Sequence, residues 1–180
     1  MTEPLACCLH GVERAEVREG QTVAVLGAGP IGLMLCACIA DAGAHPVLVG
    51  GRAARRALAP DFGAVPGDGA GADIAIEATG TAKGWRDAVA LVRRGGTAVA
   101  FSGLPSLTEV PLDARRIHYE ELTLRGAFHH TPRTVRAALA FLSSGARPWE
   151  KLLTHEVPLE GLPALFAEPP EGYLKAVVRP

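Results

Sequence analysis

The chain has 180 residues, of which 48% are hydrophobic, so it is long enough to bury a large core within one domain. Its abundant alanine, glycine and valine are typical of a parallel sheet covered by helices with small side chains. The formal net charge of −1 gives nucleic acids and acidic membranes no overall electrostatic attraction, so we expect neither as a partner.

Apolar runs and helical periodicity predict alternating elements in the first part of the chain. Helices are expected at residues 3–16, 30–42 and 52–59, and strands at residues 22–26 and 47–49. Thr2 is expected to cap the first helix, and Gly43 to end the second. The stretch 63–71 is rich in glycine, alanine and proline, which predicts a loop with at most a rudimentary strand near Ala64 and Val65.

The same alternation continues through the rest of the chain. Strands are expected at residues 73–77, 97–102 and 122–128, and helices at residues 81–92, 115–119 and 131–144. The tail is predicted to be extended at 154–157, helical at 160–166 and a strand at 173–178. This order predicts an α/β fold: a doubly wound, three-layer Rossmann sheet of parallel strands with right-handed crossovers.

Residues 21–40 contain no charged side chain and would be long enough to span a bilayer. Three glycines and Pro30 divide this run into a strand and a helix, so we expect no membrane span. Glu3 stands where a signal peptide would have basic residues, which favours a cytoplasmic protein. The cysteines stand at spacings that do not form a chelating pair, and we expect small reduced thiols at Cys7, Cys8, Cys36 and Cys38.

The most informative motif lies between the first strand and the second helix. Gly27 would allow a tight turn, Gly29 would let the backbone approach a pyrophosphate, and Gly32 would let the helix lie close to the strand. Pro30 and Ile31 open the helix, where unpaired N–H groups and the helix dipole favour an anion. The motif therefore predicts dinucleotide binding, and the alternative is a glycine-rich turn that binds nothing.

The end of the second strand bears on the choice of cofactor. NAD-specific domains place an acid there for the ribose 2′-OH, whereas no acid lies between Asp41 and Asp61 in this chain. Gly51 offers a backbone N–H, and Arg52 can pair with a 2′-phosphate, with Arg55 and Arg56 one turn further on. This pattern favours NADP over NAD, and the alternative is a solvated basic helix face.

Several segments together resemble the nucleotide-binding half of zinc-type medium-chain alcohol and polyol dehydrogenases, a group that includes sorbitol and threonine dehydrogenases. The resemblance covers nearly the whole chain, and the order and spacing of the segments make it specific. The segments that carry it are Glu3-Pro-Leu-Ala-Cys-Cys-Leu-His10, Gly20-Gln-Thr-Val-Ala-Val-Leu-Gly-Ala-Gly-Pro-Ile-Gly32, Ile76-Glu-Ala-Thr-Gly80, Gly95-Gly-Thr-Ala-Val-Ala-Phe-Ser-Gly103, Leu122-Thr-Leu-Arg-Gly126 and Thr154-His-Glu-Val-Pro-Leu-Glu160.

The resemblance implies roles for residues that follow three of the strands. Ala78, Thr79 and Gly80 would flank the adenosine ribose, and Gly103 and Leu104 would back the nicotinamide ring. The main chain of Ala127 and Phe128 would contact the carboxamide. All lie beyond the carboxyl ends of parallel strands, where such sheets bind ligands.

The resemblance also implies a missing half. Family members are nearly twice as long, and their first half is a catalytic domain that supplies a cysteine and a histidine to the catalytic zinc. We therefore expect residues 1–180 to form the dinucleotide-binding domain without that zinc domain, with 1–19 as a lead-in helix and 154–180 as a tail that packs on the missing part. Glu3 matches a third zinc ligand, or an acid beside the metal-bound water, in some relatives. By itself it is a first-turn helix acid, since catalytic zinc needs about three protein ligands.

His129 and His130 follow the sixth predicted strand, at the cofactor edge, and are the best-placed polar pair for contacts with substrate or nicotinamide. Other chemistries find no support. A short-chain dehydrogenase needs a lysine four residues after its tyrosine. In this chain Thr123 stands four residues after Tyr119, and Val177 stands four residues after Tyr173. The serines lack the nucleophile elbow of a hydrolase.

The sequence thus predicts a domain that binds NADP(H) in a zinc-type alcohol or polyol dehydrogenase, which transfers hydride to or from a secondary alcohol. Alone, it is expected to bind dinucleotide without turnover. The alternatives are a non-catalytic dinucleotide-binding module, such as a redox sensor, and a subunit completed by a separate catalytic polypeptide. Family analogy suggests a homodimer joined through sheet edges, with loose support from the apolar residues at 107–112.

Overall fold

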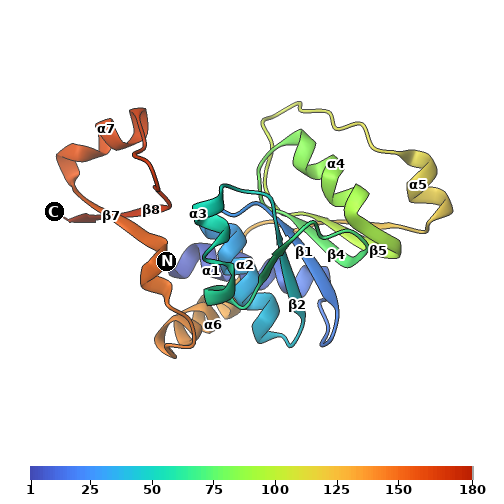
Figure 1. The fold of residues 1–180 in the computed structure, drawn as a ribbon, viewed down its shortest axis with the longest axis horizontal. Helices are drawn as coiled ribbons and strands as arrows, with labels where there is room; N and C mark the ends of the chain where they lie inside the picture. The colour runs from blue at the N-terminus through green and yellow to red at the C-terminus, as the bar shows by residue number, and fades with distance from the viewer. Residues whose placement is uncertain (180) are drawn as a thin grey trace.

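The apolar run that follows Gln21 forms the central strand of a parallel sheet in the computed structural model, which describes residues 1–179 (Figure 1). This strand, β1 (Thr22–Leu26), pairs on one side with β2 (His45–Val49) and on the other with β4 (Ala72–Glu77). The full order is β3-β2-β1-β4-β5-β6, completed by β3 (Val65–Gly67), β5 (Val92–Ala100) and β6 (Thr123–Gly126). Every neighbouring pair is parallel, so all carboxyl ends meet at one edge.

Helices cover both faces of the sheet (Figure 1). On one face α1 (Thr2–Ala15) packs between α2 (Pro30–Asp41) and α6 (Pro132–Ser143). This layer encloses the larger core, in which Leu5, Leu33 and Phe62 are fully buried. The opposite face carries α4 (Ala82–Leu91) and the short α5 (Ala114–Tyr119) over a smaller core rich in alanine. The predicted three-layer doubly wound sheet is therefore confirmed.

The tail forms a small unit beside the main sheet (Figure 1). After η2 (Trp149–Leu152), strands β7 (Leu153–Pro158) and β8 (Lys175–Arg179) pair in parallel as a separate two-stranded sheet. They are connected through η3 (Leu159–Gly161) and α7 (Leu162–Ala167). Arg55 joins the two units, since its Nη2 donates a hydrogen bond to the carbonyl oxygen of Tyr173 at 2.7 Å.

Some sequence predictions need correction. Met1, not Thr2, is the N-cap of α1, and Thr2 is the first residue of the helix. The helix expected at 52–59 is broken into α3 (Ala53–Arg56) and η1 (Ala59–Phe62), because Pro60 lacks the N–H that a continuing helix would use. The rudimentary strand expected near Ala64 and Val65 is confirmed as the three-residue β3, which completes one edge of the sheet. Among the helices of the described residues, none has the length and apolarity to cross a membrane.

Candidate cofactor-binding site

The turn between β1 and α2 is built so tightly that two of its glycines accept no side chain. Gly27 has φ +113°, and a Cβ there would lie 2.9 Å from the carbonyl oxygen of Ala78. A Cβ on Gly32 would lie 1.8 Å from the carbonyl oxygen of Gly27. The tight turn and the close helix therefore follow the sequence expectation for these two residues.

Gly29 differs from its neighbours. It is the N-cap of α2 with extended backbone angles, and a Cβ built on it would meet no protein atom within 4 Å. The space in front of Gly29 is thus open, although its backbone does not need glycine. An open approach to the backbone is what a bound pyrophosphate requires.

The first turn of α2 has the features of an anion site. The helix begins with Pro30, has no acidic residue in its first turn and receives no side-chain cap at Gly29. The N–H groups of Ile31 and Gly32 precede the first intrahelical donor, Leu33, which bonds to the Gly29 carbonyl at 3.0 Å. Free donors and the helix dipole both favour a negative charge at this position.

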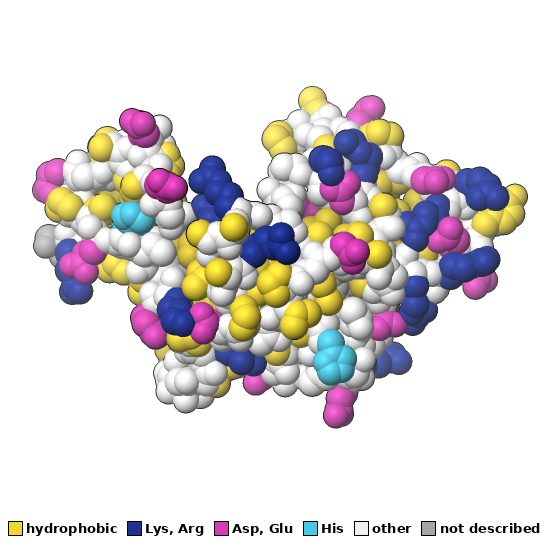
Figure 2. All heavy atoms as spheres, viewed as in Figure 1, with side chains coloured by type: hydrophobic (Ala, Val, Ile, Leu, Met, Phe, Trp, Pro, Cys, Tyr) yellow, Lys and Arg dark blue, Asp and Glu magenta, His cyan; other side chains and the backbone are white. Residues whose placement is uncertain are grey.

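The end of β2 lies against this turn. Gly50 and Gly51 adopt left-handed angles, with φ +76° and +84°, and a Cβ on Gly51 would lie 2.4 Å from the Cβ of Ala28. The chain then turns into α3, where Arg52 and Arg56 are exposed and make no side-chain hydrogen bond within residues 1–179. Figure 2 shows basic side chains gathered over α3, beside the hollow between the tail and the main sheet.

Arg55 is placed differently from what the sequence suggested. Its guanidinium is held by the carbonyl oxygen of Tyr173 in the tail, so it does not join Arg52 and Arg56 as a free cation. The sequence could not indicate this, because the partner lies 118 residues away.

The turn after β4 is organised by Glu77, a residue that sequence reasoning did not single out. This carboxylate is fully buried, and its Oε1 accepts hydrogen bonds from the Thr79 N–H at 2.5 Å, the Thr79 hydroxyl at 2.6 Å and the Gly80 N–H at 2.7 Å. Thr79 and Gly80 are thereby fixed at the carboxyl edge of the sheet. An acid directly after the apolar residues Ile74, Ala75 and Ile76 was the only signal in the sequence.

A cavity of about 280 Å³ brings together residues that the sequence had placed near the nicotinamide. Gly103, Ala127 and Phe128 follow β5 and β6, and Ile31 belongs to α2. The walls are formed by these four together with Glu3, Pro4, Cys7, Phe101 and His129. Leu104 and His130 are not among the lining residues, although both adjoin residues that are.

His129 and His130 form a contact pair at the rim of this cavity. Their Nδ1 atoms are 3.1 Å apart, and the rings meet edge to face. His129 has φ +64°, which is unusual for a residue other than glycine and costs backbone energy. His129 lines the cavity, and His130 contacts it from outside the lining.

Glu3 is exposed at the start of α1, and its Oε1 accepts a hydrogen bond from the Cys7 thiol at 3.3 Å. Partial burial, and to a smaller extent the hydrogen bond with Glu3, together raise the pKa of Cys7 to about 11. Cys8, Cys36 and Cys38 are buried, and all four cysteines are free thiols. Within residues 1–179 no three histidine, cysteine or acidic side chains are grouped to hold a metal ion. One carboxylate beside a protonated thiol does not fit a complete zinc site.

Comparison with known proteins places this arrangement among dehydrogenases. Residues 67–144 match the family model described as zinc-binding dehydrogenase. L-arabinitol 4-dehydrogenase of Aureobasidium melanogenum is 31% identical, over 99% of this chain and 55% of its own length. Sorbitol dehydrogenase of Bacillus subtilis is also 31% identical, over 89% of this chain and 50% of its own length.

The fold comparison gives the same result. A structure from Sinorhizobium meliloti, described as a zinc-binding dehydrogenase bound to NADP, superposes with a TM-score of 0.90 and 32% identity, and it matches 99% of this chain. The match covers 58% of that structure. This chain therefore spans about half the length of the relatives that it matches.

Proposed function

The chain is a homologue of the C-terminal, cofactor-binding half of zinc-type dehydrogenases, and we propose that it binds a nicotinamide dinucleotide, with a preference for NADP(H), at the turn between β1 and α2. The observation that carries this proposal is the contrast within the glycine motif. Gly27 and Gly32 are needed by the packing of the protein, whereas Gly29 faces open space beside free N–H groups. A pyrophosphate accounts for that opening.

The preference for NADP(H) is supported by the end of β2. No carboxylate is present there to repel a 2′-phosphate, and Arg52 and Arg56 are exposed with their donors free within residues 1–179. A guanidinium makes planar, charge-assisted pairs with phosphate. The Sinorhizobium meliloti structure, bound to NADP, is consistent with this assignment. Gly51 brings a backbone N–H to the same place.

The bound dinucleotide would supply hydride chemistry, and the residues of this chain would position it. Thr79 and Gly80 flank its adenosine ribose, held in place by Glu77. The main chain of Ala127 and Phe128 contacts the carboxamide, and Gly103 and Leu104 back the nicotinamide ring. His129 lines the same cavity, and we assign it to the substrate side. In a complete enzyme we expect reversible oxidation of a secondary alcohol or polyol.

Glu3 lies in the wall of this cavity and is the residue we assign to a metal in such an enzyme, as a ligand or as an acid beside a metal-bound water. It would need ligands that residues 1–179 do not group around it. We therefore expect the isolated chain to bind coenzyme without turnover. NADPH oxidation with a panel of ketones, together with zinc analysis, tests this expectation. Stoichiometric zinc with turnover would overturn it.

Titration with NADPH and NADH tests the cofactor assignment. We expect NADPH to bind more tightly, and Arg52→Ala to weaken NADPH binding about tenfold or more while leaving NADH binding unchanged, because only NADPH carries the 2′-phosphate. Arg86→Ala is the matched control, since Arg86 is an exposed arginine on α4. Equal loss of both coenzymes on Arg52→Ala would refute the 2′-phosphate assignment.

A homodimer is the quaternary arrangement that we propose. β6 is the edge strand of the main sheet, and Leu124 on it is 43% exposed. An open edge strand can pair with the same strand of a second copy around a twofold axis. Sedimentation at several concentrations tests this, and a monomer at all of them would contradict it.

A further inference from the structure

The tail, residues 153–179, is attached only lightly to the rest of the domain. Figure 1 shows it as a separate unit beside the main sheet. Its elements contact mainly one another and η2. Its buried leucines, Leu165 and Leu174, belong to neither core of the main sheet. Because a sheet of two strands is marginally stable by itself, the tail depends on whatever polar contacts hold it in place.

A single hydrogen bond provides that contact. Nη2 of Arg55 donates to the carbonyl oxygen of Tyr173 at 2.7 Å, in a partly buried position. Within the described part of the chain, no other hydrogen bond and no ion pair joins residues 153–179 to residues 1–148. A turn presents the acceptor, since the Tyr173 N–H donates to the Pro170 carbonyl oxygen at 3.1 Å and Gly172 has φ +78°. Arg55 therefore holds the tail beside α3.

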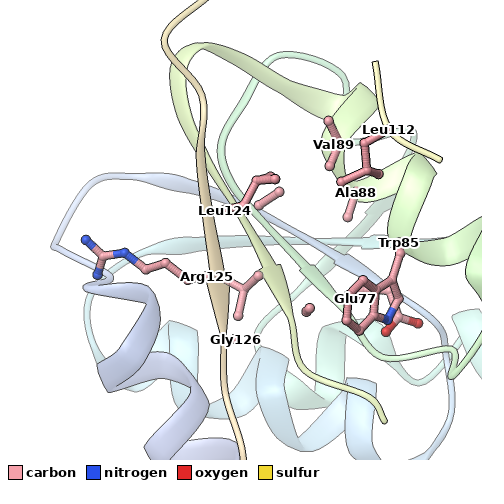
Figure 3. A pocket seen from close by; sticks show the side chains of 11 residues that line it. Glu77, Trp85, Ala88, Val89, Leu112, Leu124, Arg125 and Gly126 are labelled. Carbon is pink, nitrogen blue, oxygen red and sulfur yellow. The ribbon is translucent and has the colours of Figure 1, made fainter. Parts of the chain in front are cut away.

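The acceptor of Arg55 is an uncharged carbonyl, which a stronger acceptor could replace. Arg125 shows the contrast, because its guanidinium extends away from the sheet (Figure 3) and pairs with the carboxylate of Glu16 at 2.5 Å. No acidic side chain pairs with Arg55 within residues 1–179. A phosphate offers a guanidinium an opposite charge and two parallel hydrogen bonds, which one carbonyl oxygen does not.

The position that we assign to the 2′-phosphate is within reach of Arg55. Arg52 is the N-cap of α3, and its carbonyl oxygen accepts from the N–H groups of Arg55 and Arg56, both at 3.0 Å. Residues three apart on a helix are neighbours, with Cβ atoms about 5–6 Å apart. An arginine side chain spans that distance, so a phosphate bound by Arg52 can also receive the guanidinium of Arg55.

Acidic residues in the tail oppose a phosphate on α3. Glu168 and Glu171 are exposed and lie within five residues of Tyr173 in the sequence, and neither pairs with a basic side chain among residues 1–179. While the coenzyme site is empty, their charges attract the arginines of α3. A bound phosphate would cancel that attraction and repel the acids.

We propose that Arg55 is a latch: it holds the tail against α3 while the coenzyme site is empty, and it transfers to the 2′-phosphate when NADP(H) binds, which releases the tail. The latch rests on the proposed function, because the phosphate is that of the coenzyme. NAD(H) lacks this phosphate and leaves the latch closed. Since coupling between two sites is reciprocal, a docked tail must also weaken binding of the 2′-phosphate.

Hydrogen–deuterium exchange of the tail amides tests the holding bond without any ligand. Arg55→Ala should speed exchange in residues 153–179 about tenfold or more, because the tail loses its hydrogen bond to a charged donor. Arg56→Ala is the matched control, since Arg56 is the neighbouring arginine of α3 and has no partner in the tail within residues 1–179. It should leave exchange in the tail unchanged.

Adenosine 2′,5′-bisphosphate and 5′-AMP test the transfer, because only the first carries a 2′-phosphate. At saturation, the bisphosphate should raise exchange in the tail of the original protein to the level of Arg55→Ala. 5′-AMP should leave it unchanged. In Arg55→Ala itself, where the latch is already open, the bisphosphate should have no further effect on the tail.

Gly172→Ala tests the reciprocal effect from the tail. Its Cβ would meet no atom within 4 Å, but φ +78° is unfavourable for alanine, so the turn that presents the Tyr173 carbonyl is weakened. The variant should bind the bisphosphate about threefold more tightly and 5′-AMP equally well, although it lies outside the coenzyme site.

Two results would overturn the latch. One is unchanged tail exchange in ligand-free Arg55→Ala, and the other is a crystal structure of the bisphosphate complex in which Arg55 still bonds to Tyr173. Failure of the bisphosphate to bind the original protein would be a different result. It would refute the 2′-phosphate assignment of the proposed function, and the transfer with it, whatever the ligand-free comparison shows about the holding bond.

Discussion

Replacing Gly29 by alanine separates the needs of the fold from those of the ligand. A Cβ at this position meets no protein atom within 4 Å, and the extended backbone angles suit alanine. We therefore expect the free energy of unfolding to stay within about 0.5 kcal/mol of its original value. The methyl group would occupy the space that we assign to the pyrophosphate, so NADPH affinity should fall about tenfold or more, which is a loss of about 1.4 kcal/mol.

Gly32→Ala is the matched contrast. Its Cβ would lie 1.8 Å from the Gly27 carbonyl oxygen, a backbone atom, so α2 would have to move away from β1 by about 1 Å or more. Such overpacking costs about 1–3 kcal/mol, which lowers the Tm of a domain of this size by roughly 2–10 °C.

Thermal denaturation of both variants, with fluorescence titration of NADPH, distinguishes the two effects. Unchanged coenzyme affinity in Gly29→Ala would refute the pyrophosphate assignment. A large loss of stability in the same variant would show that the opening in front of Gly29 is needed by the fold itself.

Three further outcomes are expected. Thr131→Ala removes the capping box that Thr131 and Thr134 form at the start of α6, so urea denaturation should show a loss of about 1 kcal/mol, whereas Thr108→Ala in an exposed loop should show almost none. Iodoacetamide should label Cys7 before the buried cysteines, slowly at neutral pH and faster toward pH 11, because its raised pKa leaves little thiolate; rapid labelling at pH 7 would contradict this. Burial raises the pKa of Asp73, but the hydrogen bond from the Thr22 N–H and the ion pair with Arg93 lower it by more, so the net shift is downward. The ionised carboxylate therefore stabilises the folded protein above the pKa that Asp73 has in the unfolded chain, and this stabilisation is lost as the pH falls through its pKa in the folded protein. Asp73→Asn should therefore destabilise the protein at pH 7 and much less in strong acid, as followed by denaturation at both pH values.

Local patterns were sufficient for the central part of the fold. β1, β4 and α2 are mainly apolar segments that begin or end next to glycine or proline, and their positions follow from those residues alone. The extended, helical and strand segments of the tail were also predicted, but the pairing of β7 with β8 in a separate sheet was not, because it depends on contacts between distant segments. β3 was hard to recognise as a strand in the sequence because its three residues include a proline and a glycine.

The parts of the candidate site that are formed by backbone conformation could be predicted from the sequence. The parts that are formed by contacts between side chains and distant residues could not. Gly32 is constrained by the carbonyl oxygen of Gly27, five residues before it, and Gly27 needs glycine because of its own φ of +113°, so the motif alone indicates their geometry. Arg55 has its partner in the tail, and Glu77 acts through a turn that exists only in the folded chain. No local pattern indicates such contacts.

The packing of α1 between α2 and α6 has a consequence for synthesis on the ribosome. α1 is translated long before α6, yet part of its apolar surface is covered by that helix, which follows more than a hundred residues later. Until then, that surface has no native partner, and parallel strand pairing is itself delayed by long loop closures. The nascent chain should therefore expose an amphipathic segment until α6 has been translated, and chaperones that bind such segments would act on it during that interval.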